Sequence, residues 1–318
     1  MSIMRSQLLR GTILLIAVMA TGSVQARSIN ANAGTSAFSF LKINVGARPV
    51  ALGGALTGAS DDETALYYNP AGIALFESDR YVLGYHNYFV DMQSGFVGYI
   101  RSLDDRKTVG FYASYLNYGE FTETDLQGNI TGDFGGGDLL LAATFAMRQS
   151  RLLTVGVTAK FIRESIQDYS ATGLALDIGA RYNTDRGRYT AGLMVQNLGV
   201  QLSSLGEGDK DGLPIVLRAG GSARPKGLPM MFVGDVIVPV DNDIDFALGA
   251  EYLALKPLYL RIGWNSFGSN YRAEDSDDSL AGLAMGIGFD YNSMQLSYAF
   301  TPAADLGESH RITLTGGI

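Results

Sequence analysis

The segment from Gly46 to Phe76 reads GARPVALGGALTGASDDETALYYNPAGIALF and decides how the rest of the chain is organised. It is rich in glycine and alanine, and it precedes every segment with the pattern of a strand. Its glycines can adopt positive φ angles and allow the backbone to pack closely against other groups. They include Gly46, Gly53, Gly54 and Gly58. We therefore expect a compact insert that fits a confined space, rather than a free linker.

One short helix is predicted within this insert. Ser60 followed by Glu63 has the spacing of a capping box, which would open a helix through Ala65 and Leu66. Pro70 disfavours helical geometry in the residue before it, so the helix should end at or before Asn69. The helix and the Asn-Pro turn make the insert a folded unit.

The run from Phe40 to Ala74 resembles the N-terminal signature of the PorV/PorQ family, a branch of the FadL-like outer-membrane barrels. The matching positions are Phe40-Leu41-Lys42-Ile43, Gly46-Ala47-Arg48, Leu52-Gly53-Gly54-Ala55, Asp61-Asp62-Glu63-Thr64 and Tyr68-Asn69-Pro70-Ala71-Gly72-Ile73-Ala74. Leu52 stands where the family commonly has Met, and Ile73 where it has Leu; both changes conserve volume. A shorter match lies at Asp305-Leu306-Gly307 and His310-Arg311-Ile312.

The resemblance implies two functions. PorV-like members act in type IX secretion and hold secreted cargo at the outer membrane, which implies cargo or secretion-system components as partners. FadL-like members pass hydrophobic small molecules through the barrel, with the N-terminal region as a hatch. A secretion-associated barrel is our first expectation, and a channel for hydrophobic compounds is the alternative.

Composition limits the class of protein. The chain has 318 residues, a net charge of -8 and no cysteine, and charged residues make up 18% of it. Ordinary soluble domains carry about a quarter charged residues. The acidic balance argues against a nucleic-acid partner. The lack of cysteine excludes disulfides and thiolate metal sites.

The first residues have the pattern of a secretory signal. Arg5 and Arg10 precede or flank an apolar core from Thr12 to Ala20, and Val24-Gln25-Ala26 fits a cleavage site. The alternative, an anchoring helix, is too short to cross about 30 Å of hydrocarbon. No later stretch has the length of a membrane helix, so insertion requires a closed barrel. We predict a signal peptide (1–26), a plug or hatch in the lumen (27–79) and an outer-membrane barrel (80–318).

The barrel prediction rests on segments of about ten residues that alternate apolar with small or polar side chains. Fourteen such segments suggest an all-β, up-and-down antiparallel transmembrane barrel in contact with outer-membrane lipid. They lie near residues 80–88, 95–102, 108–116, 138–148, 152–164, 171–182, 188–198, 214–223, 229–239, 244–253, 257–266, 280–290, 293–300 and 309–316. A soluble periplasmic β-sandwich that acts as a binding module is the rival, but its polar face should be richer in charge.

The connections support the count, because every second one is short. The long ones, 117–137, 199–213 and 266–279, are expected outside the cell, opposite short periplasmic turns. A cysteine at Ser276 should then react with an impermeant maleimide in intact cells.

No catalytic constellation is evident. His86 and His310 are the only histidines and have no partner motif. We expect no enzymatic activity, metal or cofactor. The acidic run 274–278 is interpreted as a solvated loop, with a Ca²⁺ site as the alternative. The acidic run 61–63 is interpreted as favourable charge at a helix N-terminus.

Two sets of residues are candidates for the plug's attachment. Charges on the predicted inward phase of the strands should form a paired network in the lumen, since charge facing lipid is costly; they are Arg101, Lys160, Asp177, Arg181, Arg218, Glu251, Arg261 and Asp290. The latch residues of the plug are Arg48, Gly53, Gly54, Asn69, Pro70 and Gly72. We expect the Asn69 amide to bond backbone groups, and Arg48 to pair with Asp177, Glu251 or Asp290.

Overall fold

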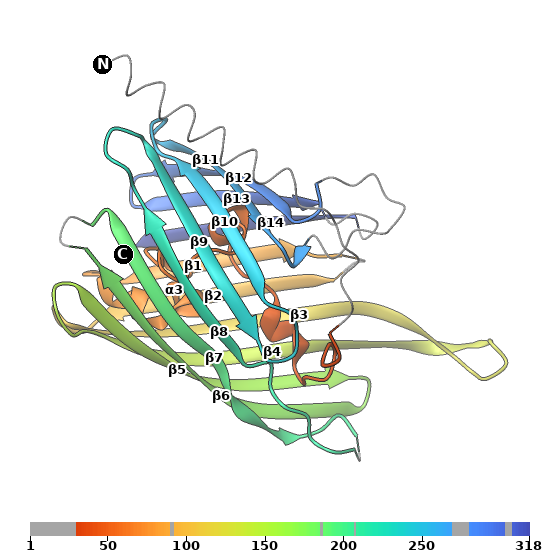
Figure 1. The fold of residues 1–318 in the computed structure, drawn as a ribbon. Coiled ribbons are helices and arrows are strands. Elements are labelled where there is room, and N and C mark those ends of the chain that lie inside the picture. The colour runs from red at the N-terminus through yellow and green to blue at the C-terminus, as the bar shows by residue number, and fades with distance from the viewer. Residues whose placement is uncertain (1–29, 90–91, 185–186, 207, 269–279, 303–306) are drawn as a thin grey trace.

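The computed structural model describes residues 30–89, 92–184, 187–206, 208–268, 280–302 and 307–318 (Figure 1). The described strands form one closed barrel of fourteen, each antiparallel to its neighbours. The first strand pairs with the last, from Arg80 opposite Gly317 to Asn87 opposite His310. The predicted up-and-down barrel is confirmed. Within the described ranges, no helix has the length and hydropathy needed to cross a membrane.

The elements follow one another around the ring in chain order. The strands are β1 (Arg80–Asn87), β2 (Gln93–Ser102), β3 (Lys107–Thr124), β4 (Ile130–Arg148), β5 (Leu153–Ile166), β6 (Tyr169–Asn183), β7 (Tyr189–Ser203), β8 (Val216–Ala223), β9 (Met230–Pro239), β10 (Asp245–Tyr252), β11 (Leu258–Asn265), β12 (Leu283–Tyr291), β13 (Met294–Pro302) and β14 (Glu308–Gly317). Four short helices precede them: η1 (Ser39–Lys42), α2 (Ala47–Ala51), α3 (Ala65–Tyr68) and η2 (Pro70–Leu75).

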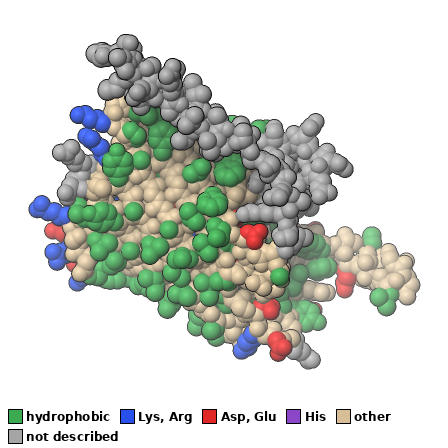
Figure 2. Space-filling model, viewed as in Figure 1, with side chains coloured by type: hydrophobic (Ala, Val, Ile, Leu, Met, Phe, Trp, Pro, Cys, Tyr) green, Lys and Arg blue, Asp and Glu red, His purple; other side chains and the backbone are tan. Residues whose placement is uncertain are grey.

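Side chains alternate between the two faces of the wall as the sequence predicts. On β5, Val157 and Phe161 are exposed on the outside, whereas Thr158 and Lys160 are buried inside. β6 repeats the pattern with exposed leucine and isoleucine against buried small and charged residues. Figure 2 shows apolar side chains spread over the visible outer face and basic side chains gathered at one end. An apolar outer band is what a bilayer requires of a barrel.

The barrel has two distinct ends. The short-turn end carries the connections 103–106, 149–152, 184–188, 224–229, 253–257 and 292–293. The opposite, long-loop end carries the connections 204–215 and 266–282 and the tip of the β3–β4 hairpin. The short-turn end lies at the left of Figure 1 and the hairpin projects to the right.

One predicted loop is a pair of strands. The segment 117–137 was expected to be an external loop, but β3 and β4 continue through it and pair from Glu120–Gly135 to Thr124–Ile130. Threonine and isoleucine favour strands, and Phe121 stacks on Phe134 across the ladder with ring centroids 5.4 Å apart. The glycines and acids that suggested a loop therefore lie in a hairpin that extends beyond the wall.

Three other expectations fall on residues outside the described ranges. These are the signal peptide, the acidic run 274–278 with its Ca²⁺ alternative, and the external position of Ser276. They stay predictions.

Residues 38–76, here called the inner segment, lie inside the barrel (red to orange in Figure 1). Residues 45–60 and 63–74 are all buried, including Tyr68 and Leu52, which are 0% exposed. α3 ends at Tyr68, directly before Asn69, as Pro70 predicts. The inner segment and the inward faces of the strands together form the hydrophobic core.

Wall glycines allow this close contact. A Cβ on Gly263 of β11 would lie 2.1 Å from the backbone nitrogen of Gly53, and one on Gly192 of β7 would lie 2.1 Å from the Thr57 carbonyl oxygen. Gly53 itself has a φ of 73°, and a Cβ there would lie 2.5 Å from the Trp264 carbonyl oxygen. Such distances admit no side chain, so backbone packs directly on backbone.

Candidate functional site

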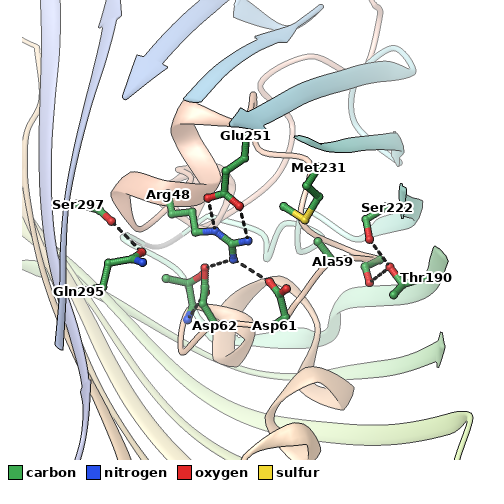
Figure 3. Close-up of polar contacts among 12 residues, drawn as sticks. Arg48, Ala59, Asp61, Asp62, Thr190, Ser222, Met231, Glu251, Gln295 and Ser297 are labelled. Atoms are coloured by element: carbon green, nitrogen blue, oxygen red, sulfur yellow. Dashed lines mark hydrogen bonds and ion pairs between the residues drawn. The ribbon is translucent and has the colours of Figure 1, made fainter. Parts of the chain in front are cut away.

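Arg48 is the centre of an ionic cluster between the inner segment and the wall (Figure 3). It lies on α2, which begins after Gly46 at a φ of 77°. Its Nε and Nη2 donate to Oε1 and Oε2 of Glu251 on β10, at 3.1 and 3.2 Å. Its Nη1 donates to Asp61 at 2.8 Å and to Asp62 at 2.7 Å. One guanidinium therefore links the wall to two parts of the inner segment.

The charges in this cluster support one another. Burial alone would lower the pKa of Arg48, but Asp61, Glu251 and Asp62 raise it well above its ordinary value. Burial favours a higher pKa for Asp61, yet Arg48 and Arg224 hold it below the ordinary value. Arg261 donates to Glu251 at 2.7 Å and so fixes the carboxylate from the other side. Buried charges of this kind are tolerated only when fully paired.

Asn69 makes a second attachment through its side-chain amide, which is 0% exposed. Its Nδ2 donates to the carbonyl oxygens of Thr57, at 2.8 Å, and of Ala180 on β6, at 3.1 Å. Its Oδ1 accepts from the Ala71 nitrogen at 3.1 Å and caps η2. The amide thus joins the inner segment to itself and to the wall.

A third attachment holds the glycine-rich turns. Arg218 of β8 donates to the Gly54 carbonyl oxygen at 2.6 Å, and its guanidinium lies 5.4 Å from the centre of the Tyr68 ring. Asp235 of β9 accepts from both the nitrogen and the hydroxyl of Thr57, at 3.0 and 2.6 Å. Arg181 of β6 donates to the carbonyl oxygens of Gly58 and Ala59, at 3.2 and 3.3 Å.

The predicted lumen charges separate into groups. Arg181, Arg218 and Glu251 contact the inner segment directly, and Arg261 supports Glu251. Lys160 and Asp177 pair within the wall at 2.6 Å, and Asp290 accepts from Tyr259 and Gln295 near the short-turn end.

Arg101 does not belong to this set, and the prediction that it faces the lumen is wrong. The inward phase of β2 runs through Phe96 and Ile100, so Arg101 lies on the exposed face. Because the side-chain period of a strand is two, a displacement of one residue reverses the face.

The predicted capping box is also wrong. α3 begins at Ala65 after Thr64, and no side chain caps it. Glu63 instead accepts from Arg80 Nε at 2.6 Å, while Asp62 accepts from the Thr64 nitrogen at 2.9 Å. Burial and the neighbouring Asp62 raise the pKa of Glu63. The acidic run therefore makes tertiary ion pairs rather than a helix cap.

Asp235 was missed by the sequence analysis. It is buried on the inward phase of β9, in step with Met231 and Val233. That alternation is the signal that marks it, because a carboxylate on an inward phase needs a partner.

Two cavities lie at the two ends of the lumen. The long-loop end holds one of about 660 Å³, lined in part by Phe38, Phe40, Val50, Phe89, Leu116 and Arg311. The short-turn end holds one of about 450 Å³, lined mainly by charged residues that include Arg48, Asp61, Arg80 and Lys256. The two cavities share no lining residue. The buried inner segment lies between them.

Residues 26–225 match the profile of the family described as type IX secretion system protein PorV. The chain belongs to the PorV family. It is an outer-membrane β-barrel, as both this family and the fold predict. No curated protein matches it.

Solved structures with a fold similar to that of this PorV-family chain include two toluene transporters and a FadL homologue. The toluene transporter TbuX of Ralstonia pickettii has a TM-score of 0.61 and 14% identity, over 86% of this chain and 98% of that chain. The toluene transporter TodX of Pseudomonas putida has a TM-score of 0.58 and 13% identity, over 85% and 96%. A Pseudomonas aeruginosa FadL homologue has a TM-score of 0.53 and 11% identity, over 86% and 98%. At these identities the likeness is one of fold.

Asn69→Ala tests the amide attachment. Removing the amide leaves the Thr57 carbonyl oxygen and the Ala71 N–H buried without that partner and removes the bond to the Ala180 carbonyl oxygen, which should destabilise the attachment by about 2–4 kcal/mol. We expect proteolysis of the inner segment to accelerate in detergent, measured by mass spectrometry of the released peptides. Asn87→Ala, on the exposed end of β1, is the control and should leave the rate unchanged. Equal rates in both variants would contradict the assignment.

Proposed function

We propose that this barrel is a component of type IX secretion that binds partner proteins at the cell surface, with its lumen closed by residues 27–79. The observation that carries the proposal is the packing of the inner segment. Its attachments to β6, β8, β9 and β10 leave separate cavities at the two ends. A barrel closed in this way suits a scaffold better than a pore, and we assign it no catalytic role.

The projecting part of the β3–β4 hairpin offers a surface for such a partner. Strand pairs from Glu120 to Thr124 and from Ile130 to Gly135 extend past the ends of β2 and β5. From residue 117 to 137 the sequence has four acidic side chains and no lysine or arginine. Leu126 is 101% exposed and Ile130 is 74% exposed. Acidic charge and exposed apolar groups at a hairpin tip are suited to a secreted protein or a secretion-system component.

Shortening the hairpin tests this role. Residues 120–134 would be deleted and Gly119 joined to Gly135, which leaves the barrel wall unchanged. We expect secreted proteins to be lost from the cell surface of the native bacterium, while the variant reaches the outer membrane at the wild-type level. A control at the opposite end replaces Leu103, an exposed residue of the connection 103–106, with Ser and should leave surface retention unchanged. Normal surface retention with the short hairpin would overturn the proposed role.

A channel for hydrophobic small molecules is the second candidate. The apolar part of the 660 Å³ cavity favours it, as does the similarity in fold to the toluene transporters TodX and TbuX. Uptake of toluene into cells that express the protein distinguishes the two functions. The closed-barrel proposal expects uptake equal to that of cells without the protein.

We propose further that residues 1–26 are removed on export. The mature chain would then begin at Arg27, which mass spectrometry of the protein from outer-membrane fractions measures. Retention of Met1 in that fraction would contradict cleavage.

A further inference from the structure

Positive charge gathers at the short-turn end of the barrel, although the chain as a whole is acidic. The six connections at this end contain seven lysines or arginines and three acidic residues. The connections at the long-loop end contain two basic and thirteen acidic residues; they are 88–92, 125–129, 167–168, 204–215, 240–244, 266–282 and 303–307. Figure 2 shows the basic side chains at the left, where Figure 1 places the short turns. The two ends therefore carry opposite charge within a chain whose net charge is -8.

Two cations at the short-turn end lie on the outer face of the wall. Arg101 is exposed on the same phase of β2 as Tyr99, which is 37% exposed. Lys107 is exposed on the same phase of β3 as Phe111, which is 56% exposed. Arg101 lies opposite Val109, two residues beyond Lys107, so the two cations are diagonal neighbours about 7–8 Å apart. Both side chains therefore face lipid at one edge of the apolar band.

Neither of these cations forms an ion pair within the described ranges. The nearby carboxylates bind other groups. Asp79 accepts from the Tyr99 hydroxyl. Asp104 accepts from the backbone nitrogen of Lys107 at 2.9 Å and holds the turn. Two like charges at neighbouring positions on one face of a sheet repel each other, and an anion between them would remove that repulsion.

The row of positive charge continues around the rim. Arg151, Arg188 and Lys226 lie in the next three short turns. Successive short turns are two strands apart, a separation of about 10 Å. Tyr182 and Tyr189 are 47% and 54% exposed on the outer face beside these turns. Because exposed aromatic residues mark the membrane interfaces of a barrel, the row lies at the level of the lipid headgroups.

We propose that the short-turn end binds the phosphodiester headgroups of anionic phospholipids, with Arg101 and Lys107 at the centre of the site. These two cations hold one headgroup between them, and the cations of the turns attract further headgroups around the rim. Charge on the lipid face costs least at the edge of the apolar band, and an anionic headgroup there stabilises it. The acidic long-loop end offers no such surface. The site needs only a barrel in a membrane, so it does not rest on the proposed function.

The test counts the lipids bound to the full-length mature protein by native mass spectrometry. The protein is purified in a neutral detergent and mixed with equal amounts of phosphatidylglycerol and phosphatidylcholine that have the same acyl chains. We expect phosphatidylglycerol to bind about tenfold or more tightly, and added salt to reduce the preference. A net charge of -8 would repel an anionic lipid, so the overall charge of the protein does not produce this preference.

Three variants locate the effect. Arg101→Gln and Lys107→Gln should each lower the preference about fivefold, the factor expected for one basic residue near an anionic surface. Arg163→Gln is the matched control, because Arg163 is exposed on the outer face of β5 but lies at the acidic long-loop end. Its loss should change the preference less than twofold. Heat-modifiable migration on gels checks that each variant is folded.

Four results would overturn the site. The first is binding of the two lipids within twofold of each other on the wild type. The second is a preference that survives the loss of both Arg101 and Lys107, and the third is a preference lost equally in Arg163→Gln. The fourth is displacement of phosphatidylglycerol by hexaglutamate at equal charge, which would assign the rim to an acidic protein instead of a lipid.

Discussion

Arg48→Met is expected to release the inner segment from the wall. The substitution leaves Glu251, Asp61 and Asp62 close together without the guanidinium that compensates them. Removing one partner of a buried ionic group costs about 3–5 kcal/mol. We expect the equilibrium between closed and released inner segment to shift by about two to four orders of magnitude.

A cysteine at Ala55 measures this shift. The chain has no native cysteine, and Ala55 is 1% exposed. Its rate of reaction with a maleimide, relative to a free thiol, reports the fraction of time that the segment is released. Arg224→Met is the control, since Arg224 pairs with Asp61 at 2.7 Å from a position where its side chain is 44% exposed. That pair should contribute less than about 1 kcal/mol. Equal labelling rates in the two variants would refute the central role of Arg48.

Gly263→Ala is expected to displace the inner segment by sterics alone. The new Cβ would lie 2.1 Å from the Gly53 nitrogen and 2.3 Å from the Leu52 carbonyl carbon. Both are backbone atoms of a buried segment, so no side-chain rotation relieves the overlap. Overpacking of this kind costs about 1–3 kcal/mol or more. The labelling rate at Ala55→Cys should rise by about tenfold or more.

Gly84→Ala is the matched control for this overlap. Gly84 lies on the inward phase of β1, where the nearest atom to an added Cβ is 3.5 Å away, an ordinary contact. We expect a change of less than about 0.5 kcal/mol. If the cysteine at position 55 reacts with the maleimide at the same rate in both alanine variants, the close contact at Gly263 does not hold the inner segment against the wall.

The barrel could be predicted from the sequence because the pattern that specifies it involves only residues close together in the chain. Alternation along each strand, as on β5 and β6, needs only a period of two and an apolar outer band. The end of α3 before Asn69 is equally local, since Pro70 constrains its predecessor. The projecting hairpin was missed because glycine and acidic residues outweighed the strand preference of Thr122, Thr124 and Ile130 in that prediction.

The partners of the site residues depend on contacts distant in sequence. Arg48 was expected to bind one of three carboxylates, and only the ring order of strands places Glu251, 203 residues away, beside it. Arg101 shows how an error of one position in phase reverses a side chain. Ser60 and Glu63 satisfied a local capping pattern, but the ion pair with Arg80 is tertiary and local spacing does not reveal it.

The most direct test of closure is the conductance of the purified protein in planar bilayers. Wild type should be almost non-conducting, because the buried inner segment lies between the two end cavities. Protein that lacks residues 27–76, and that still shows a heat-modifiable gel shift, should form steady, large channels. A wild type that conducts steadily, or a folded deletion variant with unchanged conductance, would contradict the account.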